Sequence, residues 1–196
     1  TIAFSVTFAI GLFFLLPVLA SRSIEGLLDS EILSNLVEGA IRMILFIAYI
    51  YLIGRMSEIR RVFMYHGAEH MTVHAQERDD SLDIASIRQY STAHPRCGTA
   101  FLLTVMVVAI VVFTFVGRDP LWWLIVSRIV LIPVVAAISY EIIRFSGFHS
   151  SSPLVRLITV PNLALQSLTT REPDDEQIAV AVAAMDSALK ADAQHI

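Results

Sequence analysis

The sequence has 196 residues, of which 56% are hydrophobic and 16% are charged, and its mean hydropathy is +0.68. Soluble domains contain about 25% charged residues, so this composition indicates a membrane protein. The net charge is only −4 and the basic residues are scattered, which argues against a nucleic-acid-binding protein. Cys97 is the single cysteine and cannot form a disulfide within the chain, so its thiol is available to a metal ion.

Four apolar stretches are each long enough to be predicted as membrane spans, which need about 20 mostly apolar residues. They are Thr1–Ser21, about Leu36–Gly54, Gly98–Gly117 and Pro120 to about Arg144. The second contains Glu38 and Arg42, spaced so that they can pair on one helix face. The sequence therefore predicts an all-α, polytopic membrane protein with about four transmembrane helices and further helices on the cytoplasmic side.

Arginines are unevenly distributed between the predicted loops. Six lie between the second and third spans, namely Arg55, Arg60, Arg61, Arg78, Arg88 and Arg96. The tail after the fourth span is also basic at several positions, whereas the two other loops hold only Arg22 and Arg118. By the positive-inside rule, the 54–97 segment and the C-terminus are predicted to face the cytoplasm.

Two segments follow the fourth span. Leu154–Leu168 is apolar but contains an arginine and a proline and is short for a span, so we expect an interfacial or re-entrant element. Residues 174–196 begin with acidic side chains and continue in alanine-rich helix formers, which predicts a short cytoplasmic helix. We expect residues 1–173 to form the transmembrane domain. Because Thr1 opens the sequence inside an apolar run, we also expect a longer protein.

The stretch YHGAEHMTVH, residues 65–74, places three histidines and a glutamate directly after the second span. It has no proline and one glycine, so we expect a helix that continues out of that span. His66 and His70 would then lie one turn apart, where two imidazoles can bind one ion. With Glu69 they form H-x-x-E-H, an order also used by inverted zinc peptidases. The alternative is an amphipathic interfacial helix whose histidines face lipid headgroups.

Three further residues are candidate ligands. His94 and Cys97 lie just before the third span, on the same predicted side of the membrane as the histidine motif. Glu141 lies about one turn inside the cytoplasmic end of the fourth span, where an unpaired carboxylate is costly. Each has a simpler explanation, because His94 can be a loop residue, Cys97 a small buried side chain, and Glu141 a partner of a nearby arginine.

The donor set favours a divalent metal. Zinc comes first because it accepts mixed imidazole, thiolate and carboxylate ligands, with iron or manganese behind it. His74 continues the spacing but lies about 80° around an ideal helix from His66, so we expect it outside the first ligand set. The sequence has no G-x-S-x-G, P-loop or dinucleotide motif, which argues against serine hydrolases, NTPases and nicotinamide enzymes.

Four segments carry the motifs of a known family. They are YHGAEH (65–70), HPRCGT (94–99), IPVVAAISYEIIR (132–144) and LQSLTTREPDDEQIAVA (165–181). In order and over nearly the whole chain, they resemble the YqhQ-like family of bacterial integral membrane proteins, a domain of unknown function regarded as metal-dependent enzymes. The resemblance implies the same site residues, namely His66, Glu69, His70, His94, Cys97 and Glu141. Met71 stands where the family motif continues with lysine.

These observations favour a metal-dependent, zinc-type enzyme of the bacterial inner membrane that is hydrolytic and acts at the cytoplasmic face. A metal on His66 and His70, helped by the other candidate ligands, would activate water, and Glu69 would take its proton. The expected substrate is peptide or lipid-like and is reached from the cytoplasmic leaflet, with membrane lipid as the surroundings. We expect no nucleic-acid partner.

The alternative function is not enzymatic. The same ligands can form a structural metal site in a membrane subunit or assembly factor that packs against other membrane subunits of a larger complex. A third hypothesis, an ion or proton carrier that uses Glu38, Arg42 and Arg128, would require a continuous polar path, which the sequence does not indicate.

Overall fold

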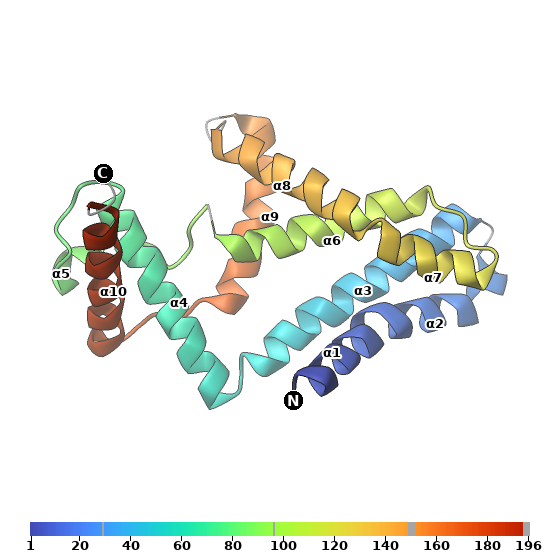
Figure 1. The fold of residues 1–196 in the computed structure, drawn as a ribbon, viewed down its shortest axis with the longest axis horizontal. Helices are drawn as coiled ribbons and strands as arrows, with labels where there is room; N and C mark the ends of the chain where they lie inside the picture. Colours follow the sequence, from blue (N-terminus) through green and yellow to red (C-terminus); the bar gives the residue numbers. More distant parts are fainter. Residues whose placement is uncertain (29, 96, 149–151, 194–196) are drawn as a thin grey trace. The chain divides into compact units, whose positions relative to one another are not determined.

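The computed structural model describes residues 1–28, 30–95, 97–148 and 152–193, and every element in these ranges is helical (Figure 1). The all-α prediction is therefore confirmed for the described residues. The chain divides into two compact units. The first unit comprises residues 1–49 and 101–148, and the second comprises residues 50–100 and the described part of 149–196. Arg96, one of the arginines used above to predict orientation, lies outside the described residues.

The first unit contains the long apolar helices. Its elements are α1 (Ile2–Ile10), a π-helical turn η1 (Gly11–Leu15), α2 (Leu16–Ser23), a 3-10 turn η2 (Glu25–Leu27), most of α3 (Glu31–Ile53), most of α6 (Gly98–Thr114), α7 (Leu121–Val130) and α8 (Ile132–Phe148). The end of α3 from Ile50 and the start of α6 up to Ala100 belong to the second unit. The run Ile2–Ser23 has 22 residues and α3 has 23, and both are long and apolar enough to cross a membrane. The first two predicted spans thus correspond to real helices of sufficient length.

The prediction of about four spans is wrong in number, because the described part of the chain holds two helices long and apolar enough to cross a membrane, or three if α7 and α8 form one bent span. α6 has 17 residues, which at 1.5 Å per residue gives about 26 Å, less than the hydrocarbon core of about 30 Å. Its C-terminal end is capped by Asn35, whose side-chain amide donates to the carbonyls of Thr114 at 3.5 Å and Val116 at 3.0 Å. The apolar sequence continues to Gly117, but the helix does not.

The fourth predicted span is broken. α7 and α8 meet at an angle of 41° on either side of Leu131. Pro133 lies two residues after Leu131, and a proline removes one backbone donor and clashes with the carbonyl four residues earlier, which favours a bend here. Whether this pair counts as one span therefore depends on the bend, which hydropathy alone does not reveal.

A second proline shapes the start of the chain. Pro17 has no N–H, so the carbonyl of Phe13, four residues earlier, lacks its normal helical donor, and the local helix widens into the π-turn η1. Arg42 of α3 supplies the missing donor, because its Nε lies 2.9 Å from the Phe13 oxygen. This bond fixes α3 beside the α1–α2 run, as Figure 1 shows.

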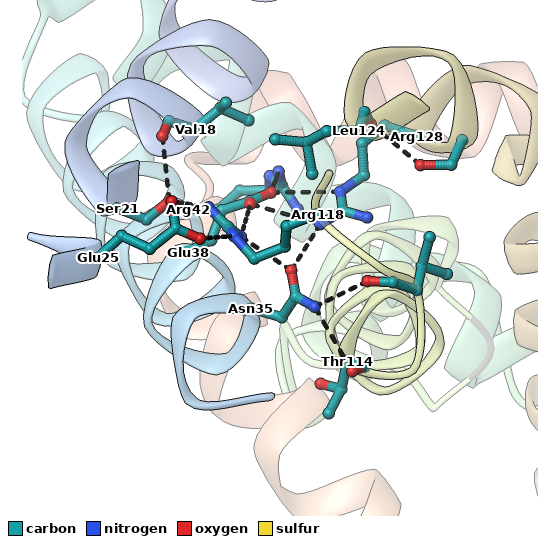
Figure 2. A network of polar contacts seen from close by, with 12 residues as sticks. Val18, Ser21, Glu25, Asn35, Glu38, Arg42, Thr114, Arg118, Leu124 and Arg128 are labelled. Atoms are coloured by element: carbon teal, nitrogen blue, oxygen red, sulfur yellow. Dashed lines mark hydrogen bonds and ion pairs between the residues drawn. The ribbon is translucent and has the colours of Figure 1, made fainter. Parts of the chain in front are cut away.

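A buried charged cluster holds the first unit together (Figure 2). Glu38 is 1% exposed and accepts hydrogen bonds from Arg42 at 2.8 Å and Arg118 at 2.9 Å, with Arg128 at 3.4 Å. Arg118, also 1% exposed, donates in addition to Ser21, Glu25 and Asn35. The predicted pairing of Glu38 with Arg42 is confirmed. The sequence did not indicate that Arg118, assigned above to a loop, is buried and joins them.

The second unit contains α4 (Ser57–Gln76), α5 (Ile84–Ile87), α9 (Pro153–Thr169) and α10 (Asp175–Ala193). α4 matches the helix expected over the histidine motif, but it does not continue the preceding span. α3 ends at Ile53, and Met56 is extended, with φ −70° and ψ 136°, so that a new helix starts at Ser57.

The core of the second unit lies between α4, α5 and α10. Ala68, Met71 and Ala75 of α4 pack with Ile87 of α5 and Ile178 of α10, and all five are at most 1% exposed. α10 runs beside α4 (Figure 1). A reciprocal pair of capping hydrogen bonds starts α10. The Asp174 carboxylate accepts from the backbone N–H of Gln177 at 2.8 Å, and the side-chain oxygen of Gln177 accepts from the backbone N–H of Asp174 at 3.0 Å.

Candidate metal site

The histidine motif lines a pocket of about 440 Å³ that lies entirely within the second unit. Its walls come from one face of α4 with its C-cap residue, from the loop that follows α5, and from the first turn of α6. The lining residues are His66, Glu69, His70, Val73, Glu77, His94, Cys97, Gly98 and Thr99. Five of the six site residues predicted from the sequence therefore line one pocket.

Gly67 explains how the back of this site is built. A Cβ atom on Gly67 would lie 2.2 Å from the carbonyl oxygen of Arg171, so only glycine permits this approach. The connection from α9 to α10 is thereby pressed against α4, and the Arg171 N–H donates to the Phe63 carbonyl at 2.9 Å. As a result, the carbonyl of Thr169 at the end of α9 reaches His66.

The loop bearing His94 and Cys97 is fixed by α9. The side-chain amide of Gln166, which is 1% exposed, accepts from the His94 N–H and donates to the His94 carbonyl, both at 2.9 Å. These two bonds pair both backbone polar groups of His94 and so fix the loop backbone at this residue. They place His94 and Cys97 opposite the histidine face of α4.

His66, His70 and Cys97 form the first donor group. One ligand atom from each lies within 4.8 Å of the others, and His66 Nε2 is 3.3 Å from the Cys97 sulfur. The ring centroids of His66 and His70 are 4.3 Å apart, as the spacing of four residues on α4 requires. At these distances, small rotations of the three side chains are enough for all of them to bind one ion.

Backbone carbonyls orient both imidazoles of this group. His66 Nδ1 donates to the Thr169 carbonyl at 2.9 Å, and His70 Nδ1 donates to the Thr92 carbonyl at 2.7 Å. Because a carbonyl only accepts, each Nδ1 carries a proton, and Nε2 is the ring nitrogen left to bind a metal ion. Metal-binding histidines are typically oriented by such a bond from the second ring nitrogen.

The Cys97 thiol is acidic. Burial opposes ionisation, but hydrogen bonds from His66, His70 and Thr99 outweigh it and lower the pKa of Cys97 from 9.0 to about 5. The bond to the thiol in turn raises the pKa of His66. Sulfur is therefore present as thiolate at neutral pH, which is the form that binds metal.

His74, Glu77 and His94 form a second donor group beside the first. Their ligand atoms also lie within 4.8 Å of one another, and His94 Nε2 is 3.3 Å from a Glu77 oxygen. Burial lowers the pKa of His94 more strongly than the Glu77 carboxylate raises it, which favours the neutral, ligating imidazole. Sequence reasoning missed Glu77, although its position three residues after His74 on a helix was a usable signal.

The two predicted carboxylates differ in position. Glu69 is exposed on the wall of the pocket. Glu141 belongs to α8 in the first unit, where its side chain is 65% exposed and 3.6 Å from Arg144. The pairing with Arg144 that was weighed against a ligand role is thus observed, and the ligand role of Glu141 stays a prediction.

Comparison with known proteins agrees with the motifs. A family model described as a protein of unknown function, DUF1385, matches residues 1–191. The uncharacterized protein YqhQ of Bacillus subtilis (strain 168) is 34% identical over 181 residues, which are 92% of this chain and 57% of the relative. The chain thus spans little more than half the length of that relative. No solved structure matches the chain significantly. Its near-complete match makes the chain a member of the DUF1385 family, as the YqhQ-like motifs indicated.

Proposed function

We propose that this chain is a metal-dependent enzyme of the bacterial inner membrane that hydrolyses its substrate at the cytoplasmic face. The observation that carries the proposal is the meeting of His66, His70 and Cys97 within 4.8 Å in a pocket whose wall also bears Glu69. Thiolate and imidazole are ligands of zinc above all, so zinc is the proposed metal.

The residues fit a divalent ion in three respects. Two imidazoles offer Nε2 to a metal ion because backbone carbonyls hold both Nδ1 protons. The thiol is acidic enough to supply a thiolate. The group offers three protein ligands, and a catalytic site keeps a fourth position open for water, whereas a structural zinc site is closed by four.

In this mechanism a bound divalent ion supplies Lewis-acid activation of a water molecule. Glu69 accepts the proton of that water while the water oxygen bonds to the carbonyl or phosphoryl centre of the substrate. Glu69 then returns the proton to the leaving group, so that the bond to that group breaks as hydrolysis requires. His70 is 5% exposed and the loop backbone is clamped at His94, so the chain holds these donors in place.

The membrane location is supported by the two long apolar helices, and the cytoplasmic orientation by the arginine distribution. A pocket in a unit that follows a span directly suits a substrate drawn from the adjacent lipid leaflet. Peptide or lipid-like substrates are therefore proposed.

The test uses the full chain purified in detergent. We expect the wild type to contain metal, His66→Ala and His70→Ala to lose it, and Glu69→Gln to keep it but lose hydrolysis of quenched-fluorescent peptides or short-chain ester lipids in mixed micelles. Glu58→Gln, an exposed glutamate on the same helix but outside the pocket, is the matched control. Wild-type turnover in Glu69→Gln would refute the role of Glu69 in activating water.

The alternative function is a non-catalytic subunit or assembly factor with a structural metal site. It is favoured because the donor side chains come from two separate elements, so that a bound metal ion would link α4 to the loop after α5. Coordination measured by X-ray absorption separates the two functions, since four protein ligands and no bound water support the alternative.

A further inference from the structure

The second donor group is not used by the function proposed above. His74, Glu77 and His94 have ligand atoms within 4.8 Å of one another, and the His74 and His94 rings are 4.5 Å apart. His94 is 5% exposed, whereas Glu77 is 32% exposed at the mouth of the pocket. Two imidazoles and one carboxylate are a common ligand set for divalent transition metals.

We propose that the pocket binds two divalent cations, one on His66, His70 and Cys97 and a second on His74, Glu77 and His94. The proposal rests on the function argued above, because it adds a second ion to the same pocket. It gives roles to Glu77 and His74, which neither the motif nor the family resemblance assigns.

The sequence spacing of the donors along α4 places them on one side of the helix. Relative to His66, an ideal helix places His70, His74 and Glu77 at about 40°, 80° and 20° around the axis. Glu77 is the C-cap residue of α4 and keeps helical backbone angles, with φ −65° and ψ −15°. All four donors therefore project from one stripe, along which His74 lies about 6 Å beyond His70. Such a stripe presents two successive pairs of ligands, each facing the loop across the pocket.

The loop supplies the matching donors in the reverse order, because it runs antiparallel to the order of the two pairs on α4. Cys97 lies against the His66 and His70 pair, and His94 lies against the His74 and Glu77 pair. The distance between the His70 and His94 ring centroids is 5.8 Å, so the two groups adjoin without sharing a ligand. One loop thus completes both sets.

The second group is oriented as the first one is. His74 Nε2 donates to the Ala93 carbonyl at 2.9 Å, so His74 keeps its lone pair on Nδ1. The adjacent carbonyl, that of Thr92, holds His70 in the same way. Successive carbonyls of one loop therefore fix one imidazole of each group, and Gln166 clamps the backbone of His94 itself. Such supporting bonds are what distinguish built metal sites from chance clusters.

The two sites differ in chemistry, which makes them separable. The first contains a thiolate and the second contains only nitrogen and oxygen donors. Cobalt(II) bound to a thiolate gives an intense sulfur-to-metal charge-transfer band in the near ultraviolet, and cobalt bound to nitrogen and oxygen does not. Cobalt titration of the full, metal-stripped chain in detergent therefore reports each site.

We expect two equivalents of cobalt in the wild type and in the control Glu58→Gln. A variant with both His74→Gln and Glu77→Gln should bind one equivalent and keep the charge-transfer band. Cys97→Ser with His66→Gln should bind one equivalent without the band. Glutamine preserves side-chain size and the donor to the Ala93 carbonyl, and Glu77→Gln alone, at a partly exposed position, tests the second site with the least effect on folding.

The outcomes distinguish the two proposals. One equivalent in the wild type, with the band, overturns the second site and leaves the proposed function standing. No bound cobalt in the wild type overturns both. Two equivalents in the His74→Gln and Glu77→Gln variant, with the wild-type affinities, overturn the assignment of these residues. Loss of one equivalent in Glu77→Gln with unchanged far-ultraviolet circular dichroism supports the proposal.

Discussion

Replacing Gly67 by alanine tests how the site is built. The new Cβ would lie 2.2 Å from the Arg171 oxygen, 3.2 Å from its carbonyl carbon and 3.3 Å from Thr92 Cγ2. The nearest atom is backbone, so the α9–α10 connection must move. Overpacking of this kind costs about 1–3 kcal/mol. Loss of the Arg171–Phe63 hydrogen bond costs about 1 kcal/mol, and the better helix propensity of alanine returns about 1 kcal/mol.

The expected loss of unfolding free energy is therefore about 1–3 kcal/mol, which lowers Tm by about 2–4 °C for each kcal/mol in a chain of this size. The displaced connection also carries the Thr169 carbonyl away from His66, and removing such a bond weakens metal binding about 10–100-fold. Thermal unfolding in detergent and metal titration measure the two effects. Gly11→Ala, where nothing lies within 4 Å of the new Cβ, is the control. Wild-type Tm and affinity in Gly67→Ala would refute the reasoning.

Three further predictions follow from the described contacts. In the metal-free protein, alkylation of Cys97 by iodoacetamide should persist at pH 6 and fall as pH drops through about 5, because protonation removes the thiolate. His66→Ala should move this fall toward higher pH, and a pH profile unchanged by that variant would contradict the role of the His66 hydrogen bond. Glu38→Gln should destabilise the protein by about 3–5 kcal/mol in thermal or denaturant unfolding, because it leaves the buried guanidiniums of Arg42 and Arg128 without their carboxylate, whereas Glu58→Gln should change little. Asp174→Ala should cost about 0.5–2 kcal/mol by removing the cap of α10, and an equal loss in Asp186→Ala, near the other end of that helix, would show that capping is not the cause.

Some of the site could be predicted because it is local. The distance between His66 and His70 follows from four residues of helix, and the helix follows from a stretch without proline. The thiol and His94 were found because their residue types are unusual in so apolar a chain. Hydropathy likewise identified the Ile2–Ser23 run and α3. It overestimated the length of α6, which a capping side chain ends, and it did not reveal the bend between α7 and α8.

The sequence by itself determined that the chain is helical and apolar, and that α4 carries a stripe of ligand side chains, because periodicity and composition act through neighbours a few residues apart. Only the tertiary structure decided which groups complete the stripe. The Thr169 carbonyl meets His66 across 103 positions, and the Gln166 amide meets His94 across 72. Likewise, Arg118 is buried because it meets Glu38 across 80 positions. Such partners are chosen by the packing of whole helices, with Gly67 permitting the closest approach, and no local pattern in the sequence encodes that choice.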